Sequence, residues 1–412
     1  MKKLKIAVYY PWVHLKGGIE RSMIALISKS RHDWTIFTSH YDAANTFPEF
    51  ENLKIVTHGS VSVRRDMGSV LGAAAKMAAL KLPLDDFDAY VVWCDGLGPL
   101  TTFRNNHLPT FCICSTPLRP VYDWVYAKEA LRSRKPLAKL AYHSFKHSFR
   151  FVDRLAWKRF DGVVATSLEV KERIVEHGLY KDDSRMALHY PGIEFGSAPE
   201  DITYEPFFLV PGRITWTKNI ALAIAAFRKA ALPEPWRLVI AGFVDEKSQR
   251  HLLELNQLAD GHPRIEFVLS PSDKELNSLY RRASAILFTP LNEDWGITPL
   301  EAMLNMKPVI ANNQGGPAES VIPGETGWLL RPNNVTAWAD IIIRAATNPE
   351  RLRLMGQKAR EHVQRYDWSQ FFNGVDDLIS HGVSSHTPIR VTRLRTKRAL
   401  RTAKRSVAKS KS

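Results

Sequence analysis

The sequence predicts an α/β protein of two domains, each built on a parallel β-sheet. Short apolar runs alternate with helical patterns along most of the chain, which is the signature of βαβ units. The pattern stops at 191–206, a segment rich in Gly, Pro and acidic residues that reads as a linker, and then restarts. With 412 residues and 45% hydrophobic content, the chain is long enough to form two cores.

The first domain is expected over residues 1–200 and the second over 201–365. Seven apolar runs predict the strands of the first domain, at 4–10, 34–40, 53–59, 89–95, 110–116, 162–167 and 186–190. Six more predict those of the second, at 207–213, 237–243, 265–270, 285–291, 308–313 and 327–330. Helices are expected at 335–347 and 349–381, and a basic tail without a core-forming face at 383–412.

The net charge of +15 is concentrated in two segments. Residues 128–159 hold ten basic and two acidic residues, and residues 383–412 hold ten basic and no acidic ones. Each basic residue near an anionic lipid surface contributes about 1 kcal/mol of attraction. We therefore expect peripheral attachment to an anionic membrane surface, on the inner, cytoplasmic face of the cell membrane. No specific nucleic acid is expected as a partner, because the tail lacks aromatic residues for base stacking.

Neither a membrane span, an export signal nor a metal site is expected. Lys76 and Lys81 interrupt the longest apolar neighbourhood, and the N-terminal apolar stretch is too short for a signal peptide. The Asp-x-Asp at 85–88 directly precedes a strand and is interpreted as a turn. The three cysteines fall in strands, which favours buried reduced thiols over a metal pair. No cofactor is expected.

The stretch NEDWGITPLEAM, residues 292–303, is the clearest candidate site. Thr298, Pro299 and Glu301 fit a helix N-terminal capping box, in which Glu301 is only a cap. Glu293 lies outside that box, at the end of a buried strand. Strand ends that face a helix N-terminus bind anions in open α/β sheets. We therefore expect an anionic ligand whose uncharged parts contact the two glutamates.

Two further segments follow predicted strands. In RITWTKN, Arg213 and Lys218 would converge on a diphosphate, although a solvated turn is the alternative for the pair taken alone. Gly17 and Gly18 precede a helical pattern, where their backbone N–H groups could approach an anion or simply form a turn. The chain has no Walker A or G-x-G-x-x-G spacing at these positions.

These motifs resemble a known family. VPGRITWTKN, EDWGITPLEAM and KPVIANNQGGPAESVIPGETGWLL are similar to the carboxy-terminal domain of retaining glycosyltransferases with the GT-B fold, in the large family 4, or group 1. The 292–303 form most resembles the mannosyltransferase branch, where Phe usually stands in place of Trp295. The resemblance spans about 4–380 and is strong over 208–332. It implies two Rossmann-like domains whose sheets face each other across a cleft, with a C-terminal helix at 366–382 packing back on the first domain.

The resemblance also implies roles for individual residues. Arg213 and Lys218 would bind the donor diphosphate, Glu301 the ribose, and Glu293 would lie beside the donor sugar as a hydroxyl ligand or charge stabiliser. Catalysis would rest on Glu293, Arg213 and Lys218. The remaining donor-binding positions are Gly17, Gly18, Gly212, Trp295, Gly296, Ile297 and Thr298.

The stretch CSTPLRPVYDW, residues 114–124, resembles a His-Thr-Pro-x-Arg segment of mannosyltransferase-like members, with Ser115 in place of the His. Ser115, Thr116 and Arg119 are the acceptor-binding candidates. A structural clasp between Arg119 and Asp123 is the alternative.

The function implied is transfer of a sugar from a nucleoside-diphosphate sugar to a lipid-linked or cell-envelope glycan acceptor, with retention of anomeric configuration. GDP-mannose is the first candidate donor. The alternatives are a soluble synthase acting on a sugar phosphate or glucan, a nucleotide-sugar-binding protein without turnover, and a basic nucleic-acid-binding protein.

Overall fold

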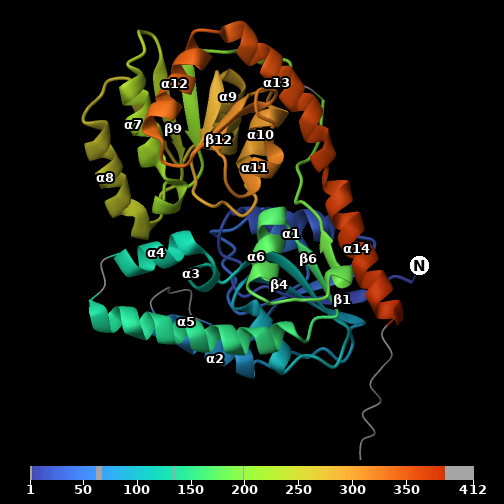
Figure 1. Cartoon of the computed structure of the whole chain (residues 1–412). Helices are drawn as coiled ribbons and strands as arrows, with labels where there is room; N and C mark the ends of the chain where they lie inside the picture. Colours follow the sequence, from blue (N-terminus) through green and yellow to red (C-terminus); the bar gives the residue numbers. More distant parts are fainter. Residues whose placement is uncertain (1, 62–66, 133–134, 198, 386–412) are drawn as a thin grey trace, which may run out of the picture.

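Two parallel sheets, one in each half of the chain, organise the molecule (Figure 1). The computed structural model describes residues 2–61, 67–132, 135–197 and 199–385. The first sheet has the order β3-β2-β1-β4-β5-β6-β7 and the second β10-β9-β8-β11-β12-β13, with all pairs parallel. Each of the thirteen strands in the described residues overlaps with a predicted run, so the predicted fold class is confirmed.

The first sheet is covered by helices on both faces. Its strands are β1 (Lys5–Tyr9), β2 (Asp33–Thr38), β3 (Ile55–Thr57), β4 (Ala89–Gly96), β5 (Thr110–Pro117), β6 (Gly162–Ala165) and β7 (Met186–Leu188). The helices that follow them are α1 (Gly18–Lys29), α2 (Met67–Ala79), α3 (Arg119–Tyr122), α4 (Trp124–Arg132), α5 (Pro136–Trp157) and α6 (Leu168–Glu176). The side chains of β4 alternate between the two faces of the sheet. Tyr90 packs on one face in the core cluster that contains Trp157, and Trp93 packs on the other face in the cluster that contains Trp34.

The second sheet is built in the same way. Its strands are β8 (Phe207–Pro211), β9 (Arg237–Gly242), β10 (Ile265–Leu269), β11 (Ala285–Phe288), β12 (Val309–Asn312) and β13 (Gly327–Leu330). Its helices are α7 (Ile220–Ala230), α8 (Gln249–Ala259), α9 (Asp273–Arg282), α10 (Ile297–Leu304), α11 (Gly316–Ser320), α12 (Val335–Ala346) and α13 (Pro349–Val363). The strand order reverses at β8, between β9 and β11, and open α/β sheets bind ligands outside the carboxyl ends of strands at such a point.

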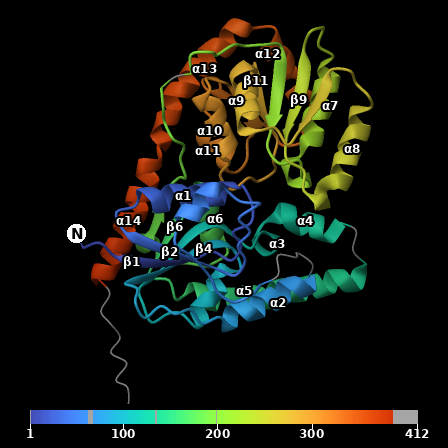
Figure 2. The same cartoon turned by 180° about the vertical axis from the view of Figure 1, so that it is seen from behind.

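The helix predicted over 349–381 is two helices. α13 ends at Val363, a 3-10 turn covers Gln364–Tyr366, and α14 runs over Trp368–Ser385. The break has a local cause, because the Asp367 carboxylate accepts a hydrogen bond from the backbone N–H of Ser369 at 2.8 Å and thereby starts a new helix. Figures 1 and 2 both show α13 and α14 running along one side of the two domains.

α14 returns the chain to the first domain. Its residues Phe371, Val375 and Ile379 are buried in the core cluster that contains Trp93. The Asp376 carboxylate accepts hydrogen bonds from the Ser30 hydroxyl at 2.7 Å and the Arg31 backbone N–H at 3.0 Å, just after α1. The predicted return of the C-terminal helix is therefore confirmed. The basic tail beyond 385 lies outside the described residues.

Candidate active site

The carboxyl ends of β8 and β11 bring the predicted diphosphate ligands together. Gly212 follows β8 with a φ of +121°, and the exposed Arg213 comes next. Lys218 ends a 3-10 turn, Trp216–Lys218, directly before the left-handed Asn219 and α7. A small pocket is lined by Gly212, Arg213 and Lys218 together with the end of β11. Both cations thus flank one strand end, as the sequence predicted.

Lys218 forms an ion pair with Glu293. The ammonium Nζ donates to Glu293 Oε1 at 3.1 Å and to Oε2 at 2.9 Å, and both side chains are largely buried. Burial raises the pKa of Glu293, but the positive charges of Lys218, Arg119 and Arg213 outweigh it and hold the pKa below its ordinary value. Glu293 is therefore an anion in the site at neutral pH.

The capping box predicted at Thr298 is wrong. Gly296, with a φ of +84°, is the N-cap residue of α10, and the helix begins at Ile297, so Thr298 and Pro299 lie within its first turn. A Cβ at position 296 would lie 3.1 Å from the Phe288 ring, so the position favours glycine for both its conformation and its packing. Glu301 consequently does not cap the helix.

Glu301 binds two side chains instead. Its Oε2 accepts a hydrogen bond from the hydroxyl of Tyr280 on α9, and its Oε1 from the guanidinium of Arg21 on α1, both at 2.9 Å. The two glutamates of the 292–303 stretch are thus both held by donors, Glu293 by a cation of its own domain and Glu301 partly by a cation of the other domain.

The side chain of Trp295 packs in the protein interior and holds its loop in place. It is buried, its indole N–H donates to the carbonyl of Pro191 at 2.8 Å, and its ring lies 4.4 Å from that of Tyr190. The contact anchors the loop of Glu293 to the start of the linker. Only the backbone of Trp295 can face a ligand, which is consistent with its departure from the usual Phe.

Gly17 and Gly18 lie opposite this loop. Gly17 is the N-cap residue of α1, which begins at Gly18, and a Cβ on Gly18 would lie 3.4 Å from Ile297 Cδ1. The N-termini of α1 and α10 therefore approach each other between the domains. Behind Gly17, the buried Glu20 accepts a hydrogen bond from the Tyr10 hydroxyl at 3.3 Å, and burial raises the pKa of Glu20 to about 7.

Arg119 forms the structural clasp that the sequence offered as its alternative role. It donates to the Asp123 carboxylate at 2.6 and 3.0 Å. It also donates to Asp294 Oδ2 at 3.0 Å and to the carbonyl of Asn292 at 2.6 Å, across the domain boundary. Arg119 thus positions the loop that carries Glu293.

The other two acceptor candidates, Ser115 and Thr116, lie at the carboxyl end of β5. The Ser115 hydroxyl accepts a hydrogen bond from the Trp93 indole N–H at 2.9 Å. The Thr116 hydroxyl donates to the carbonyl of Pro117 at 3.0 Å and accepts from Arg173 at 3.1 Å. Their roles toward an acceptor stay predictions.

Like Arg21, Arg173 and Glu319 join the two domains although the sequence did not single them out. Arg173 of α6 donates to the Asp294 carboxylate. Glu319 of α11 accepts hydrogen bonds from the backbone N–H groups of Leu168 and Glu169 at 2.8 and 3.0 Å, and so caps α6 from the other domain. Partners separated by 121 to 151 residues leave no local sequence signal, although Asp294 stands beside Glu293 in the motif.

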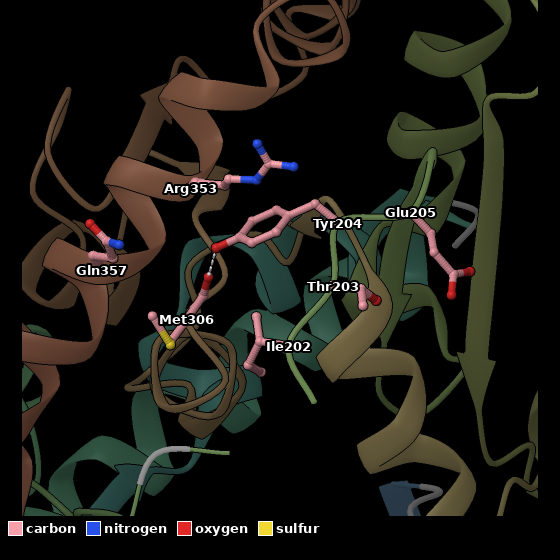
Figure 3. Close-up of a pocket in the computed structure, with 7 residues that line it drawn as sticks. All are labelled: Ile202, Thr203, Tyr204, Glu205, Met306, Arg353 and Gln357. Atoms are coloured by element: carbon pink, nitrogen blue, oxygen red, sulfur yellow. Dashed lines mark hydrogen bonds between the residues drawn. The ribbon is translucent and has the colours of Figure 1, made fainter. Parts of the chain in front are cut away.

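A second cavity, larger than the pocket beside Lys218, lies elsewhere. It has a volume of about 530 Å³ and is lined by linker residues Ile202, Thr203, Tyr204 and Glu205 with Met306, Arg353 and Gln357 (Figure 3). The Tyr204 hydroxyl donates to the Met306 carbonyl at 2.6 Å there. We place the candidate site at the strand ends, because Arg213, Lys218 and Glu293 come together there.

Within the described ranges, no cluster of His, Cys, Asp or Glu is arranged to hold a metal ion. The Asp-x-Asp lies at a turn over Asp85 and Asp86, as predicted, and Asp88 accepts a hydrogen bond from the backbone N–H of Lys5 on β1 at 2.8 Å. Cys94, Cys112 and Cys114 are buried free thiols, as predicted. None of the helices described is both long and apolar enough to cross a membrane.

Comparison with known proteins places this geometry in context. Residues 197–362 match the family described as glycosyl transferases group 1. Alpha-1,3/1,6-mannosyltransferase alg-2 of Neurospora crassa is 35% identical over 39% of this chain, which corresponds to 41% of that protein. The Schizosaccharomyces pombe alg2 protein is 25% identical over 93% of this chain and 82% of its own length, and human ALG2 26% over 84% and 89%.

Solved structures share the fold. Anabaena HepE, in complex with UDP and glucose, matches with a TM-score of 0.70 at 18% identity, over 92% of this chain and 100% of HepE. Sucrose-phosphate synthase from Thermosynechococcus elongatus matches with a TM-score of 0.71 at 18% identity, over 93% of this chain and 100% of that one. Both likenesses support two parallel-sheet domains in the same arrangement.

Proposed function

We propose that this chain, whose residues 197–362 match the group 1 glycosyltransferases and whose two parallel-sheet domains have the GT-B fold, transfers mannose from GDP-mannose to a lipid-linked glycan acceptor with retention of anomeric configuration. The observation that carries the proposal is the ion pair of Lys218 and Glu293 beside Arg213, at the switch point of the second sheet.

The diphosphate is assigned to Arg213, Lys218 and the N-terminus of α10. A diphosphate carries two to three negative charges, and Arg can grip two phosphate oxygens at once. The N-terminal N–H groups of α10 add a partial positive charge. In the donor-free chain Glu293 neutralises Lys218; when the donor binds, the ammonium turns to the phosphate and the carboxylate to the hydroxyls of the sugar.

Glu293 acts as a ligand of the sugar. Its pKa is held below the ordinary value, so it is a weak base and stays ionised during turnover. An anion beside the sugar favours the positive charge that develops on the ring as the anomeric carbon–oxygen bond breaks. The acceptor hydroxyl attacks from the face of the departing diphosphate, and its proton passes to the leaving phosphate oxygen.

Mannose is assigned from the relatives, whose names describe alpha-1,3/1,6-mannosyltransferases. A lipid-linked acceptor fits the surface of α5, on the side of the first domain away from the second (Figures 1 and 2). There Leu137, Leu140 and Phe151 are 78%, 64% and 67% exposed among basic residues. Basic amphipathic helices of this kind lie on anionic membranes. We propose that this face rests on the cytoplasmic side of a membrane.

The test is a donor panel. Binding of GDP-mannose, GDP-glucose, UDP-glucose and UDP-N-acetylglucosamine is measured by thermal shift, and transfer by incorporation of labelled sugar into lipid-linked glycans in extracted membranes. GDP-mannose at a thousand times its Kd should stabilise the fold by about 4 kcal/mol. Stabilisation by a UDP-sugar alone would contradict the assigned donor, and no stabilisation by any donor would contradict the function.

A further inference from the structure

The carboxylate of Glu301 is already engaged on both oxygens. Oε2 accepts from Tyr280 and Oε1 from Arg21, each at 2.9 Å. Tyr280 belongs to the same domain as Glu301, whereas Arg21 reaches it from α1 of the first domain, 280 residues away in sequence. A ligand held between the domains would approach Glu301 from the side that Arg21 occupies.

The two partners of Glu301 differ in how freely their side chains can move. Tyr280 is buried and packs in the core of the second domain, so it fixes the carboxylate. The Arg21 side chain is 49% exposed and has a long flexible stem, and its guanidinium lies 5.6 Å from the centre of the Phe47 ring. An ion pair this exposed is weak. Arg21 can therefore leave Glu301, whereas Tyr280 stays.

We propose that Arg21 competes with the donor ribose for Glu301 and thereby sets how strongly the site selects nucleotides that carry the ribose hydroxyls. In the donor-free chain it takes the place that a ribose hydroxyl takes in the complex, and it links α1 to α10. This inference rests on the proposed function, which assigns Glu301 to the ribose. Removing Arg21 should therefore increase the contribution of the ribose hydroxyls to binding.

The test compares each nucleotide with its form lacking those hydroxyls. Titration calorimetry measures the Kd of GDP, UDP and their 2′,3′-dideoxy forms, and the base that binds more tightly is used. The discrimination is the Kd of the dideoxy form divided by the Kd of the ribose form. The charge lost in Arg21→Ala weakens both forms equally and cancels in this ratio.

Arg21→Ala should raise the discrimination roughly threefold, in line with the strength of an exposed ion pair, and Arg21→Lys should leave it near the wild-type value. Arg31→Ala is the matched control: Arg31 forms a similarly exposed ion pair with Asp377 on α14, away from the cleft, at 2.6 Å. It should leave the discrimination unchanged.

The variant Glu301→Gln distinguishes failure of the proposed competition from failure of the proposed donor site. If this variant loses most of the discrimination but Arg21→Ala leaves it unchanged or lowers it, the competition is contradicted and the proposed function stands. If Glu301→Gln keeps the discrimination, or if neither nucleotide binds the wild-type protein, the proposed donor site itself is contradicted.

Discussion

At the scale of single residues, the proposed chemistry rests on the ion pair of Lys218 and Glu293. Lys218 is the strongest of the charges that lower the pKa of Glu293, against the effect of burial. The same ammonium is the cation nearest to Glu293 that a diphosphate could recruit. In the proposed donor site, Lys218 would therefore both keep Glu293 ionised and supply a cation for the diphosphate.

We predict that Lys218→Met lowers kcat/KM by about 10² to 10³, because the leaving diphosphate loses a preorganised cation. Without that charge the pKa of Glu293 should rise, so the acid limb of the pH–rate profile should move to higher pH. Steady-state transfer assays between pH 5 and 8 measure both effects. Lys229→Met, which changes an exposed lysine on α7, should behave as wild type. Activity of Lys218→Met within threefold of wild type would contradict the assigned role.

A second lysine, Lys307, is buried against the Tyr204 ring, 3.8 Å from its centre. Burial lowers the pKa of Lys307 to about 7, although the carboxylate of Glu205 opposes the shift. The unfolded chain keeps an ordinary lysine pKa of about 10.4. Between pH 7 and 10 the unfolded state therefore binds more protons, and stability rises with pH.

We predict that Lys307→Met is more stable than wild type by about 1 to 3 kcal/mol at pH 6.5, where the folded protein must bury the charged ammonium. The advantage should shrink toward pH 10. Denaturant unfolding at pH 6.5, 8 and 9.5 measures it, again with Lys229→Met as the control. An advantage that is constant over this range would show that packing, rather than titration, decides the effect.

Some residues of the candidate site could be predicted from the sequence, and others could not. Arg213, Lys218 and Glu293 stand next to strand ends, so a rule about strand ends identifies them. The capping box at Thr298 failed because Gly296 adopts a positive φ and starts α10 two residues earlier. Arg21 and Arg173 act on partners in the other domain, and no spacing in the sequence indicates such contacts.

At the scale of elements, the strands were predictable because both faces of each sheet are covered. Such strands are continuous apolar runs of four to eight residues, which the sequence displays directly. The end of α13 was not predictable from periodicity, since apolar residues recur at helical intervals on both sides of Asp367. The polar cap at Asp367 alone marks the break.

The packing of α14 should contribute to the stability of the first domain. We predict that Phe371→Ala destabilises the protein by about 3 to 5 kcal/mol, because the ring is fully buried against that domain. Phe243→Ala, at a half-exposed phenylalanine after β9, should cost less than about 0.5 kcal/mol. Thermal unfolding with limited proteolysis compares the two variants. Equal effects would mean that α14 does not stabilise the first domain.

At the scale of the whole molecule, charged groups join the domains around the site. Asp294 and Glu319 of the second domain bind Arg119, Arg173 and the N-terminus of α6 in the first. The loop that carries Glu293 is thus held from both sides. The contacts between the domains and the position of the Glu293 loop are therefore coupled.

The proposed attachment to a membrane also concerns the whole molecule. We predict that changing Leu137, Leu140 and Phe151 of α5 to Ser reduces partitioning onto anionic liposomes at least tenfold, since a buried side chain of this kind contributes about 1.5 to 3 kcal/mol. Pelleting with phosphatidylglycerol vesicles measures the effect. The control changes three exposed leucines of the second domain, Leu253, Leu269 and Leu354, to Ser. Equal loss in both variants would contradict a specific membrane face on α5.

The central claim is that a nucleoside-diphosphate sugar lies between the two sheets. A structure of the chain with GDP bound tests it most directly. The account predicts the diphosphate against Arg213, Lys218 and the N-terminus of α10, with the ribose at Glu301. A nucleotide bound in the cavity beside Tyr204 (Figure 3), with the ion pair of Lys218 and Glu293 intact and no ligand between the domains, would contradict it.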